Sequence, residues 1–339
     1  MKASAVVFTG PNSVVYRTID CPEPGPGDVV VELHHSWISN GTEGSFLRGE
    51  RLSGDEAWKP GDPAPFPMVA GYQKVGRVVN VGSAVSDLRP GDWVFASMSK
   101  VCGMFDNRFA GHVSPSVCDR SAVIPLPTGA DPLAYSGLVL TQVGLNCGLR
   151  PQIEPGQLAV VVGDGLVGQW AGQTLVQRGV RVIMIGHRED RLARFRKFGA
   201  TVKGGGDFGL AAVRALEDGP IQTLIETIGQ VDVLDTYRPM MARGGQVVIA
   251  GFYRPSGAVN LQTSLQAFRN HELSFHLVSG ATRERLEMTM SWLKAGKLDA
   301  LGLLTHRFPV EKAAEAWALI DDKRESVLGV VLDWPASRA

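Results

Sequence analysis

QLAVVVGDGLVGQWAGQTLVQRGV, residues 157–180, is the stretch that decides the fold of this chain. Its apolar run at 158–162 is short and rich in β-branched residues, which predicts a strand buried on both faces. Helical spacing of apolar residues follows at 166–178 and ends at Gly179, and a second apolar strand is expected at 181–185. Strand, turn, helix and strand in this order predict one βαβ unit of a parallel sheet.

Three glycines stand between the first strand and the helix with G-x-G-x-x-G spacing. Gly163 permits the tight turn, Gly165 lets a pyrophosphate approach the backbone, and Gly168 lets the helix pack close to the strand. The free N–H groups at the helix start, around Leu166 and Val167, would then receive the phosphates. The stretch predicts a dinucleotide site, and a glycine turn in an unrelated α/β protein is the alternative interpretation.

The end of the second strand indicates which dinucleotide is bound. An acidic residue there would hold the ribose 2′-hydroxyl of NAD, but the expected position holds Gly186. His187 and Arg188, with Arg191, can supply hydrogen-bond donors and positive charge to a 2′-phosphate. The sequence therefore predicts NADP(H) over NAD(H), with the alternative that both arginines belong to a solvated helix start.

Length and composition narrow the remaining classes of protein. A chain of 339 residues suggests about two domains. Its 34 Lys and Arg balance 34 Asp and Glu, so neither nucleic acid nor an anionic membrane surface is indicated as a partner. Four cysteines without paired spacing do not make a disulfide scaffold, and no signal peptide or apolar run of ~18 residues is recognisable. We expect a cytoplasmic enzyme that acts on a small molecule.

The rest of the chain divides into a β-rich part and a part where strands and helices alternate. Residues 1–125 are expected to be all-β, without a long helical period. Helical patterns begin at 131–148, and the βα rhythm then continues beyond the dinucleotide unit. The tail at 306–334 predicts strand, helix and strand, which we expect to rejoin the first part.

Several stretches resemble the medium-chain dehydrogenase/reductase superfamily, and the likeness covers nearly the whole chain. They are EPGPGDVVV at 23–31, GTE at 41–43, VAGYQKVGRV at 69–78, RPGDWV at 89–94, the glycine loop, IETIG at 225–229 and LTHRFP at 304–309. The resemblance implies an α/β protein with two domains and an active site in the cleft between them. A GroES-like β-barrel catalytic domain would span 1–130, completed by 285–339, and a Rossmann domain with a doubly wound parallel sheet would span 131–284.

The resemblance also implies further contacts to the cofactor and a class of reaction. The expected cofactor contacts are Thr141, Thr227, Ile228, Gly251 and Phe252. YRTID at 16–20, HSWISNGTE at 35–43 and GYQ at 71–73 look most like the bacteriochlorophyllide dehydrogenase branch, which oxidises a secondary hydroxyethyl group to a ketone. Two alternatives stay open: an enoyl or quinone reductase acting on an activated C=C bond, and a non-catalytic NADPH-binding protein.

Three positions depart from the zinc-dependent members of the superfamily. Asn40 stands where a cysteine ligand would be, and Tyr72 stands where a histidine ligand would be. The third ligand would fall near Ser136 or Gly137, and none of these residues is a good ligand for zinc. The cysteine-rich lobe that holds a structural zinc in the family is missing as well. We therefore expect a zinc-independent enzyme.

Without zinc, hydride transfer needs another group that polarises a carbonyl or moves a proton. The resemblance places Tyr72 at the reacting oxygen, with Asn40 nearby as a hydrogen-bond donor and Thr42 at the proton-relay hydroxyl of the family. The alternatives are that Tyr72 only fills the vacated metal space and that Thr42 caps local backbone.

Two further expectations concern the substrate pocket and the assembly. The proline-rich segment 48–67 would run beside the cleft, where Phe46, Trp58 and Phe66 would shape the substrate pocket, unless it is a simple surface loop. The β-rich segment 272–279 would end the Rossmann sheet at an exposed edge. Such an edge favours pairing with its two-fold mate, so a homodimer is expected.

Overall fold

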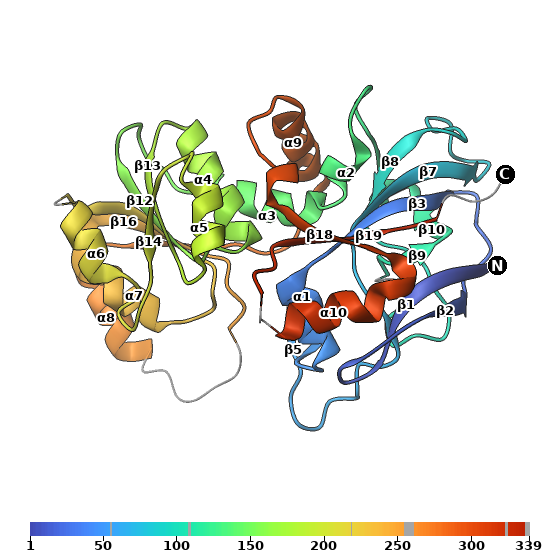
Figure 1. Ribbon diagram of the computed structural model, residues 1–339, viewed down its shortest axis with the longest axis horizontal. Coiled ribbons are helices and arrows are strands. Elements are labelled where there is room, and N and C mark those ends of the chain that lie inside the picture. The colour runs from blue at the N-terminus through green and yellow to red at the C-terminus, as the bar shows by residue number, and fades with distance from the viewer. Residues whose placement is uncertain (55, 108–109, 218, 254–260, 323–324, 336–339) are drawn as a thin grey trace. The chain divides into compact units, whose positions relative to one another are not determined.

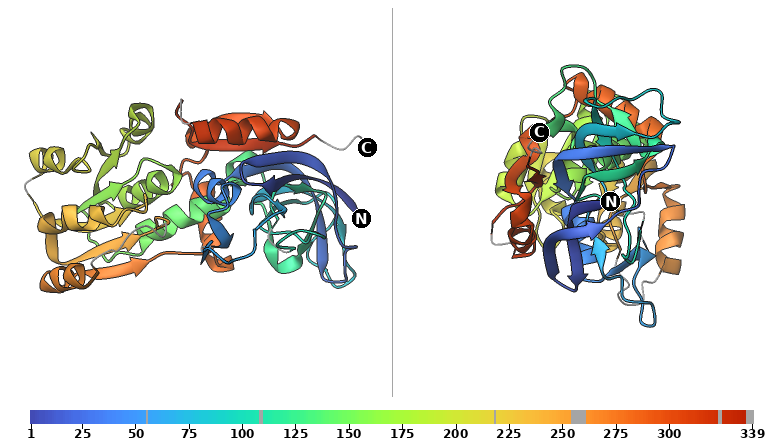
Figure 2. Two further views of the ribbon diagram at one scale, coloured as in Figure 1. Left: turned by 90° about the horizontal axis from the view of Figure 1, so that it is seen from below. Right: turned by 90° about the vertical axis from the view of Figure 1, so that its right-hand side faces the viewer.

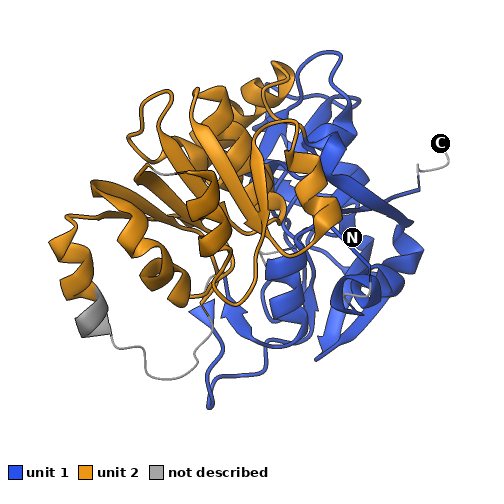
Figure 3. Ribbon diagram, turned by 60° about the vertical axis from the view of Figure 1, so that its left-hand side comes forward, with its two compact units in different colours: residues 1–139, 300–339 blue, residues 140–299 orange. Residues whose placement is uncertain are grey.

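The computed structural model describes residues 1–54, 56–107, 110–217, 219–253, 261–322 and 325–335. Two compact units make up the chain (Figure 3): residues 1–139 with 300–339, and residues 140–299. Both divisions lie later in the chain than the expected boundaries after residues 130 and 284. In the described part of the chain, no helix is both long enough and apolar enough to cross a bilayer.

The later boundary near residue 299 has a physical cause. The turn after α9 (Arg283–Lys294) is held by α4 (Leu166–Gln177) through Asp299. The Nε1–H of Trp170 donates to the carbonyl of Asp299 at 3.2 Å, and the N–H of Asp299 donates to Oε1 of Gln173 at 2.8 Å. These bonds fix the turn to the second unit, so only the chain from residue 300 onward completes the first unit.

The second unit is built on one parallel sheet, as predicted. Its strands are β12 (Leu158–Val162), β13 (Arg181–Gly186), β14 (Ala200–Lys203), β15 (Ile221–Glu226), β16 (Met241–Ile249) and β17 (Ser274–Leu277). Their spatial order is β14-β13-β12-β15-β16-β17, so the sheet is wound outward in both directions from β12. Every residue of β12 is buried, which is the pattern of a strand covered on both faces.

Helices cover both faces of this sheet (Figures 1 and 2). One face packs on α4, α5 (Glu189–Phe195) and the part of α3 (Leu138–Leu149) that belongs to this unit. The other face packs on α6 (Leu210–Leu216), α7 (Asp232–Tyr237) and Phe268 of α8 (Leu261–Asn270). Alternate residues of β12 supply the two cores, with Val161 on the first face and Val160 on the second.

The first unit contains a two-stranded sheet of β4 (Arg51–Ser53) and β5 (Glu56–Ala57) and, in addition, two larger sheets that form the GroES-like domain. The smaller of these two has the order β2 (Ser13–Asp20), β1 (Lys2–Gly10), β6 (Met68–Val69), with β9 (Val113–Ser114) also on β1. The larger one has the order β11 (Val123–Pro125), β8 (Trp93–Ala96), β7 (Lys74–Val81), β3 (Asp28–Ile38), β19 (Gly329–Asp333), β18 (Leu304–Pro309), with β10 (Ser116–Asp119) also on β3. β19 pairs antiparallel with β3, so the tail rejoins the first part of the chain as expected.

The tail also supplies part of the first unit's core. Helix α10 (Ala313–Asp322), the red helix in Figure 2, packs on β2. Its Trp317 is buried and meets the ring of Phe8 edge-on, with the ring centroids 5.4 Å apart. Such aromatic pairs add to the burial of apolar area, which here ties the two ends of the chain together.

Two helical segments differ from the expectations. α1 (Asn40–Leu47) interrupts the part that was predicted to be all-β. It is buried from Glu43 to Leu47 and has no polar face, so the apolar periodicity that marks a surface helix is absent. The helix expected at 131–148 is divided into α2 (Pro132–Tyr135) and α3, and Gly137 between them lies against Trp37, where an added Cβ would be 2.9 Å from the ring.

Candidate active site

The glycine loop in the second unit has the geometry that the spacing predicts. Gly163 has φ +121°, which disfavours other residues, and an added Cβ there would lie 2.0 Å from Oγ1 of Thr227. A Cβ on Gly168 would lie 2.0 Å from the carbonyl oxygen of Gly163, so α4 and β12 approach as closely as glycine allows. Gly165 caps α4, and a Cβ on it would meet nothing within 4 Å. The loop is therefore tight toward the protein and open on the side where a phosphate would bind.

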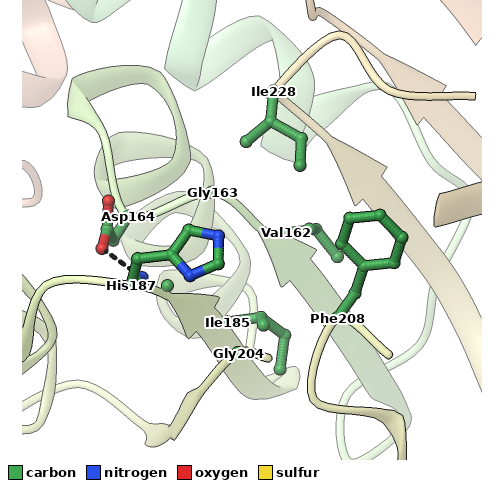
Figure 4. Close-up of a pocket in the computed structure, with 9 residues that line it drawn as sticks. Val162, Gly163, Asp164, Ile185, His187, Gly204, Phe208 and Ile228 are labelled. Atoms are coloured by element: carbon green, nitrogen blue, oxygen red, sulfur yellow. Dashed lines mark hydrogen bonds between the residues drawn. The ribbon is translucent and has the colours of Figure 1, made fainter. Parts of the chain in front are cut away.

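A pocket lies beside this loop, at the carboxyl ends of β12 and β13 (Figure 4). Its lining residues are Val162, Gly163, Asp164, Ile185, Gly186, His187, Gly204, Phe208 and Ile228. The imidazole of His187 and the side chains of Phe208 and Ile228 extend into it in Figure 4. Open α/β sheets bind nucleotides at this edge, where the strand order reverses.

A carboxylate that the sequence pattern did not indicate lies beside the end of β13. It belongs to Asp164, the second residue of the glycine motif, and it reaches across to the turn that follows β13. Its Oδ2 accepts the backbone N–H groups of His187 and Arg188, both at 2.9 Å, and its Oδ1 lies 3.3 Å from Nη1 of Arg191. The premise that no acidic group occupies this strand end is therefore corrected, because Asp164 places one beside Gly186.

A second loop next to the pocket is organised by a buried carboxylate. Oε1 of Glu226, at the end of β15, accepts the backbone N–H groups of Ile228 and Gly229, both at 2.6 Å. Its Oε2 accepts the hydroxyl of Tyr253 at 2.6 Å, and burial together with this carboxylate raises the pKa of Tyr253 far above its usual range. Glu226 and Tyr253 were not singled out in the sequence, although the carboxylate follows directly after an apolar strand.

The other residues expected at the cofactor lie in the loops after β15 and β16 and in the helices α3 and α4. Thr227 donates its hydroxyl to the carbonyl of Val162 at 2.9 Å and so joins the two loops. Gly251 and Phe252 pack against Gly229, where an added Cβ would lie 2.3 Å from the carbonyl oxygen of Phe252. Thr141 is fully buried in α3. Leu166 and Val167 start α4, whereas Arg188 lies beside the pocket and is not among the residues that line it.

In the first unit, the structure brings Tyr72 and Thr42 together. The hydroxyl of Tyr72 shares side-chain hydrogen bonds with Ser39 and Thr42, at the start of α1. Burial is the main cause that raises the pKa of Tyr72 to about 12; the hydrogen bonds with Ser39 and Thr42 limit the rise, and the charge of Glu43 adds to it. The phenol is therefore neutral at physiological pH and can act as a hydrogen-bond donor but not as a base.

Asn40 starts α1 and is oriented by the end of the chain. Its Nδ2 donates to the carbonyl of Leu328 at 2.7 Å, which fixes the direction of the amide. Its Oδ1 is buried and has no hydrogen-bond partner in the described part of the chain. Asn40 was expected to act as a donor, but the atom that is available is an acceptor, suited to a hydroxyl group.

A buried network holds the start of α1 in place. Oε1 of Glu43 accepts the N–H of Ser39 at 2.8 Å, and its Oε2 lies 3.0 Å from Nε2 of His112. Nδ1 of His112 is 2.7 Å from Oγ of Ser36, which also accepts the indole N–H of Trp334 at 2.8 Å. His112, Glu43 and Ser36 are almost fully buried, so the network is a rigid support for the residues beside Tyr72.

The remaining expected positions are occupied as follows. Ser136 is buried and donates its hydroxyl to the carbonyl of Leu133 at 2.8 Å, and Gly137 has no side chain. Among the described residues, no group of three or more His, Cys, Asp and Glu is arranged to hold a metal ion. Phe46 is 3% exposed and belongs to the core that includes Trp317, rather than to an open pocket wall.

The two other residues expected at the substrate pocket lie at the surface segment that follows α1. Phe66 packs on the edge of the core beside Gly49, and the indole of Trp58 donates to the carbonyl of Pro63 at 3.2 Å. This indole bond holds the segment to itself, as in a surface loop anchored by one tryptophan.

Comparison with known proteins gives matches in both units. Residues 25–129 match the alcohol dehydrogenase GroES-like domain, and residues 167–295 match the zinc-binding dehydrogenase family. A 2-desacetyl-2-hydroxyethyl bacteriochlorophyllide A dehydrogenase of Cereibacter sphaeroides is 26% identical, over 99% of this chain and 100% of that protein. L-galactonate-5-dehydrogenase of Escherichia coli is 24% identical, over 97% of this chain and 98% of its own length.

Solved structures of dehydrogenases share the fold. A candidate zinc-binding dehydrogenase from Sinorhizobium meliloti, bound to NADP, has a TM-score of 0.81 and 20% identity, covering 98% of this chain and 99% of its own. A short chain alcohol dehydrogenase of Escherichia coli, complexed with NADH, has a TM-score of 0.82 and 19% identity, and the match covers 98% of this chain and 99% of that one. With both units matched and relatives aligned along the chain, this protein belongs to the medium-chain dehydrogenase/reductase superfamily of oxidoreductases.

Proposed function

We propose that this chain is a zinc-independent, NADP(H)-dependent oxidoreductase that interconverts a secondary alcohol and a ketone. The observation that carries the proposal is the neutral Tyr72 hydroxyl, hydrogen-bonded by Ser39 and Thr42 at the position where zinc-dependent relatives hold a metal ligand. The Cereibacter relative carries a name that describes a hydroxyethyl compound, and several other relatives are named as dehydrogenases of alcohols or hydroxy acids. These names support the alcohol/ketone class but not a particular substrate.

The residues of the second unit fit a nicotinamide dinucleotide. The N–H groups at the start of α4 are available to the pyrophosphate because Gly165 leaves open space before them. His187 and Arg188 stand at the strand end where the 2′-phosphate of NADP(H) would lie. The NADP bound to the Sinorhizobium structure supports this choice, whereas the NADH in the Escherichia structure shows that the fold accepts either dinucleotide. When bound, the nicotinamide accepts or supplies the hydride.

The residues of the first unit fit the oxygen of the substrate. The protonated phenol of Tyr72 can donate a hydrogen bond to a ketone oxygen and stabilise the negative charge that develops on it during reduction. In the opposite direction, Oδ1 of Asn40 can accept the hydroxyl proton of the alcohol in a hydrogen bond. During reduction the phenol can give its proton to the alkoxide that forms, and the partly exposed Thr42, bonded to Tyr72, can relay a replacement proton from solvent; in the oxidation direction the alcohol proton leaves by the same route. The network from Glu43 to His112 holds this arrangement without entering the chemistry.

Turnover on a matched panel tests the reaction class. We expect NADPH oxidation with ketones and NADP⁺ reduction with the corresponding secondary alcohols, and little turnover with enones or quinones of similar size. Faster turnover of enones or quinones would favour an enoyl or quinone reductase. Binding of NADPH with no turnover on either panel would favour a non-catalytic protein.

The same preparation tests whether the enzyme is independent of zinc. Asn40, Tyr72, Ser136 and Gly137 replace good zinc ligands, so metal analysis after dialysis is expected to find no stoichiometric zinc. A chelator should leave the turnover rate unchanged. One zinc ion per chain that is needed for activity would contradict the proposal.

Cofactor preference is tested by replacing Arg188. NADPH is expected to bind more tightly than NADH, and Arg188→Ala should weaken NADPH binding by about tenfold or more because a charge-assisted contact is lost. NADH binding should change little, and fluorescence titration measures both constants. Arg214→Ala is the matched control, since Arg214 is an exposed arginine of the same unit that does not line the pocket. Equal affinities in the unaltered protein would refute the preference.

Two substitutions at Tyr72 separate a chemical role from a space-filling one. Tyr72→Phe should lower kcat by about 10²-fold or more, because the donor to the reacting oxygen is removed. The melting temperature and the affinity for NADPH should hardly change. If the ring only fills space, Tyr72→Phe will be nearly silent, whereas Tyr72→Ala will cost roughly 3–5 kcal/mol of stability. Tyr16→Phe, which removes a phenol elsewhere in the same unit, is the control.

We also propose a homodimer formed through β17. This strand is the outer strand of the parallel sheet, with Phe275 37% and Leu277 76% exposed. An apolar edge with unpaired backbone groups favours antiparallel pairing with a second copy. Light scattering should give a dimer mass, and Leu277→Asp should give a monomer. Leu216→Asp places the same charge on another exposed leucine and should leave the dimer intact. A monomer mass for the unaltered chain at micromolar concentration would rule the dimer out.

A further inference from the structure

Residues 164 and 186 occupy the same space at the end of β13. Gly186 belongs to the strand and has no positive φ, so its backbone does not require glycine. An added Cβ on residue 186 would nevertheless lie 2.4 Å from both Cβ and Oδ2 of Asp164. Cβ atoms do not approach so closely, and the Cβ of Asp164 is fixed by the tight loop on either side of it. Glycine is therefore needed at 186 because Asp164 is there.

The carboxylate of Asp164 is used within the protein. Its two oxygens are bonded to the His187 and Arg188 N–H groups and to the guanidinium of Arg191. The side chain is 10% exposed, and the paired Arg191 is 23% exposed. Gln169 of α4 adds a bond from its Nε2 to the carbonyl of Arg191 at 2.9 Å. The glycine loop, α4 and the turn after β13 are thus joined into one rigid piece.

An acidic residue on the strand itself would have a different effect. Its side chain would be free to accept the ribose 2′-hydroxyl, which favours NAD(H). The charge of Asp164 is instead balanced by Arg191 and by two backbone dipoles, so it opposes a nearby phosphate less than an unpaired carboxylate would. In Figure 4 the Asp164 carboxylate lies at the margin of the pocket, while the imidazole of His187 extends over it.

We propose that Asp164 is a positioning residue for cofactor discrimination, which holds the turn of His187 and Arg188 so that it binds the 2′-phosphate. The inference rests on the proposed function only in that the site binds NADP(H). It adds that the preference depends on a residue in the glycine loop and not only on the charged residues after β13. Weakening the bonds of the Asp164 carboxylate should therefore weaken the binding of NADPH and change the binding of NADH, which has no 2′-phosphate, much less.

Asp164→Asn is the decisive substitution because it keeps the shape of the side chain. A neutral amide oxygen holds the two N–H groups more weakly than a carboxylate does, and its NH₂ group cannot pair with Arg191. We expect the Kd of NADPH to rise by about tenfold and that of NADH to change by less than about threefold. Fluorescence titration with each cofactor measures both, and thermal melting confirms that the variant is folded. Tighter NADPH binding, or a selective loss of NADH, would overturn the inference and make Asp164 a ribose ligand.

Moving the carboxylate provides an independent test. Gly186→Ala alone should destabilise the protein because its Cβ meets Asp164, and the double variant with Asp164→Gly should lose less stability than the two single variants summed, because the clash is then absent. The double variant Asp164→Gly with Gly186→Asp places the acid on the strand and should reverse the ratio of NADPH to NADH affinity. If the double variant is folded and its ratio of NADPH to NADH affinity is the same as in the unaltered protein, the inference is overturned.

The two levels of the proposal fail in different ways. An unaltered protein that prefers NADH would overturn the proposed cofactor, and the inference with it. An unaltered protein that prefers NADPH, with the same preference in Asp164→Asn, would leave the proposed function standing and remove only the role of Asp164. Arg214→Ala again serves as the control for effects of a changed surface charge in this unit.

Discussion

The close approach of α4 to β12 is the constraint on which the nucleotide-binding unit depends. The carbonyl oxygen of Gly163 occupies the place where a side chain on residue 168 would begin. The helix can therefore start directly at the strand end, with its first N–H groups unshielded. The opposite side of α4 is fitted in the same way, since added Cβ atoms on Gly144 and Gly148 would lie 2.5 Å from Trp170 and Thr174. Backbone contact on two sides leaves the helix little freedom to shift.

Each unit uses a buried carboxylate to shape the loop beside its candidate site. Glu43 holds the start of α1 through Ser39 and is paired with His112, while Glu226 holds two backbone N–H groups and the hydroxyl of Tyr253. A buried carboxylate is tolerated only when its oxygens are well bonded. The loops are consequently fixed by groups that would be costly to leave unpaired, and not by apolar contact alone.

The sequence predicts the parallel sheet well because that signal is local. The run from Leu158 to Val162, the glycine spacing and the second strand all lie within one βαβ unit, and the structure confirms them. Helix α1 was missed because five consecutive residues, Glu43 to Leu47, are buried, so the sequence shows no alternation of an apolar and a polar face. The second unit extends to residue 299, beyond the expected 284, because the bonds of Trp170 and Gln173 with Asp299 connect segments far apart in the chain.

The candidate sites were predicted only in part for the same reason. The family likeness indicated Tyr72 and Thr42 as two separate candidates, and the hydrogen bond that joins them could not be read from a pattern because they are far apart in the sequence. Asp164 was not singled out in the sequence, although it reaches the strand end where Gly186 stands. The identity of a side chain can be read from the sequence, but the direction in which it points depends on the turn that carries it.

The overlap between residues 164 and 186 has a consequence for natural variation among related chains. A side chain can fill the space from the loop or from the strand, but two side chains cannot share it. Substitutions at positions 164 and 186 should therefore be correlated among related chains, and a larger residue at one position should be rare without a smaller residue at the other. Relatives that carry an acid on the strand would be expected to carry a small residue in the loop. A comparison of sequences would then show these two positions as one correlated site, although 164 and 186 lie on different elements.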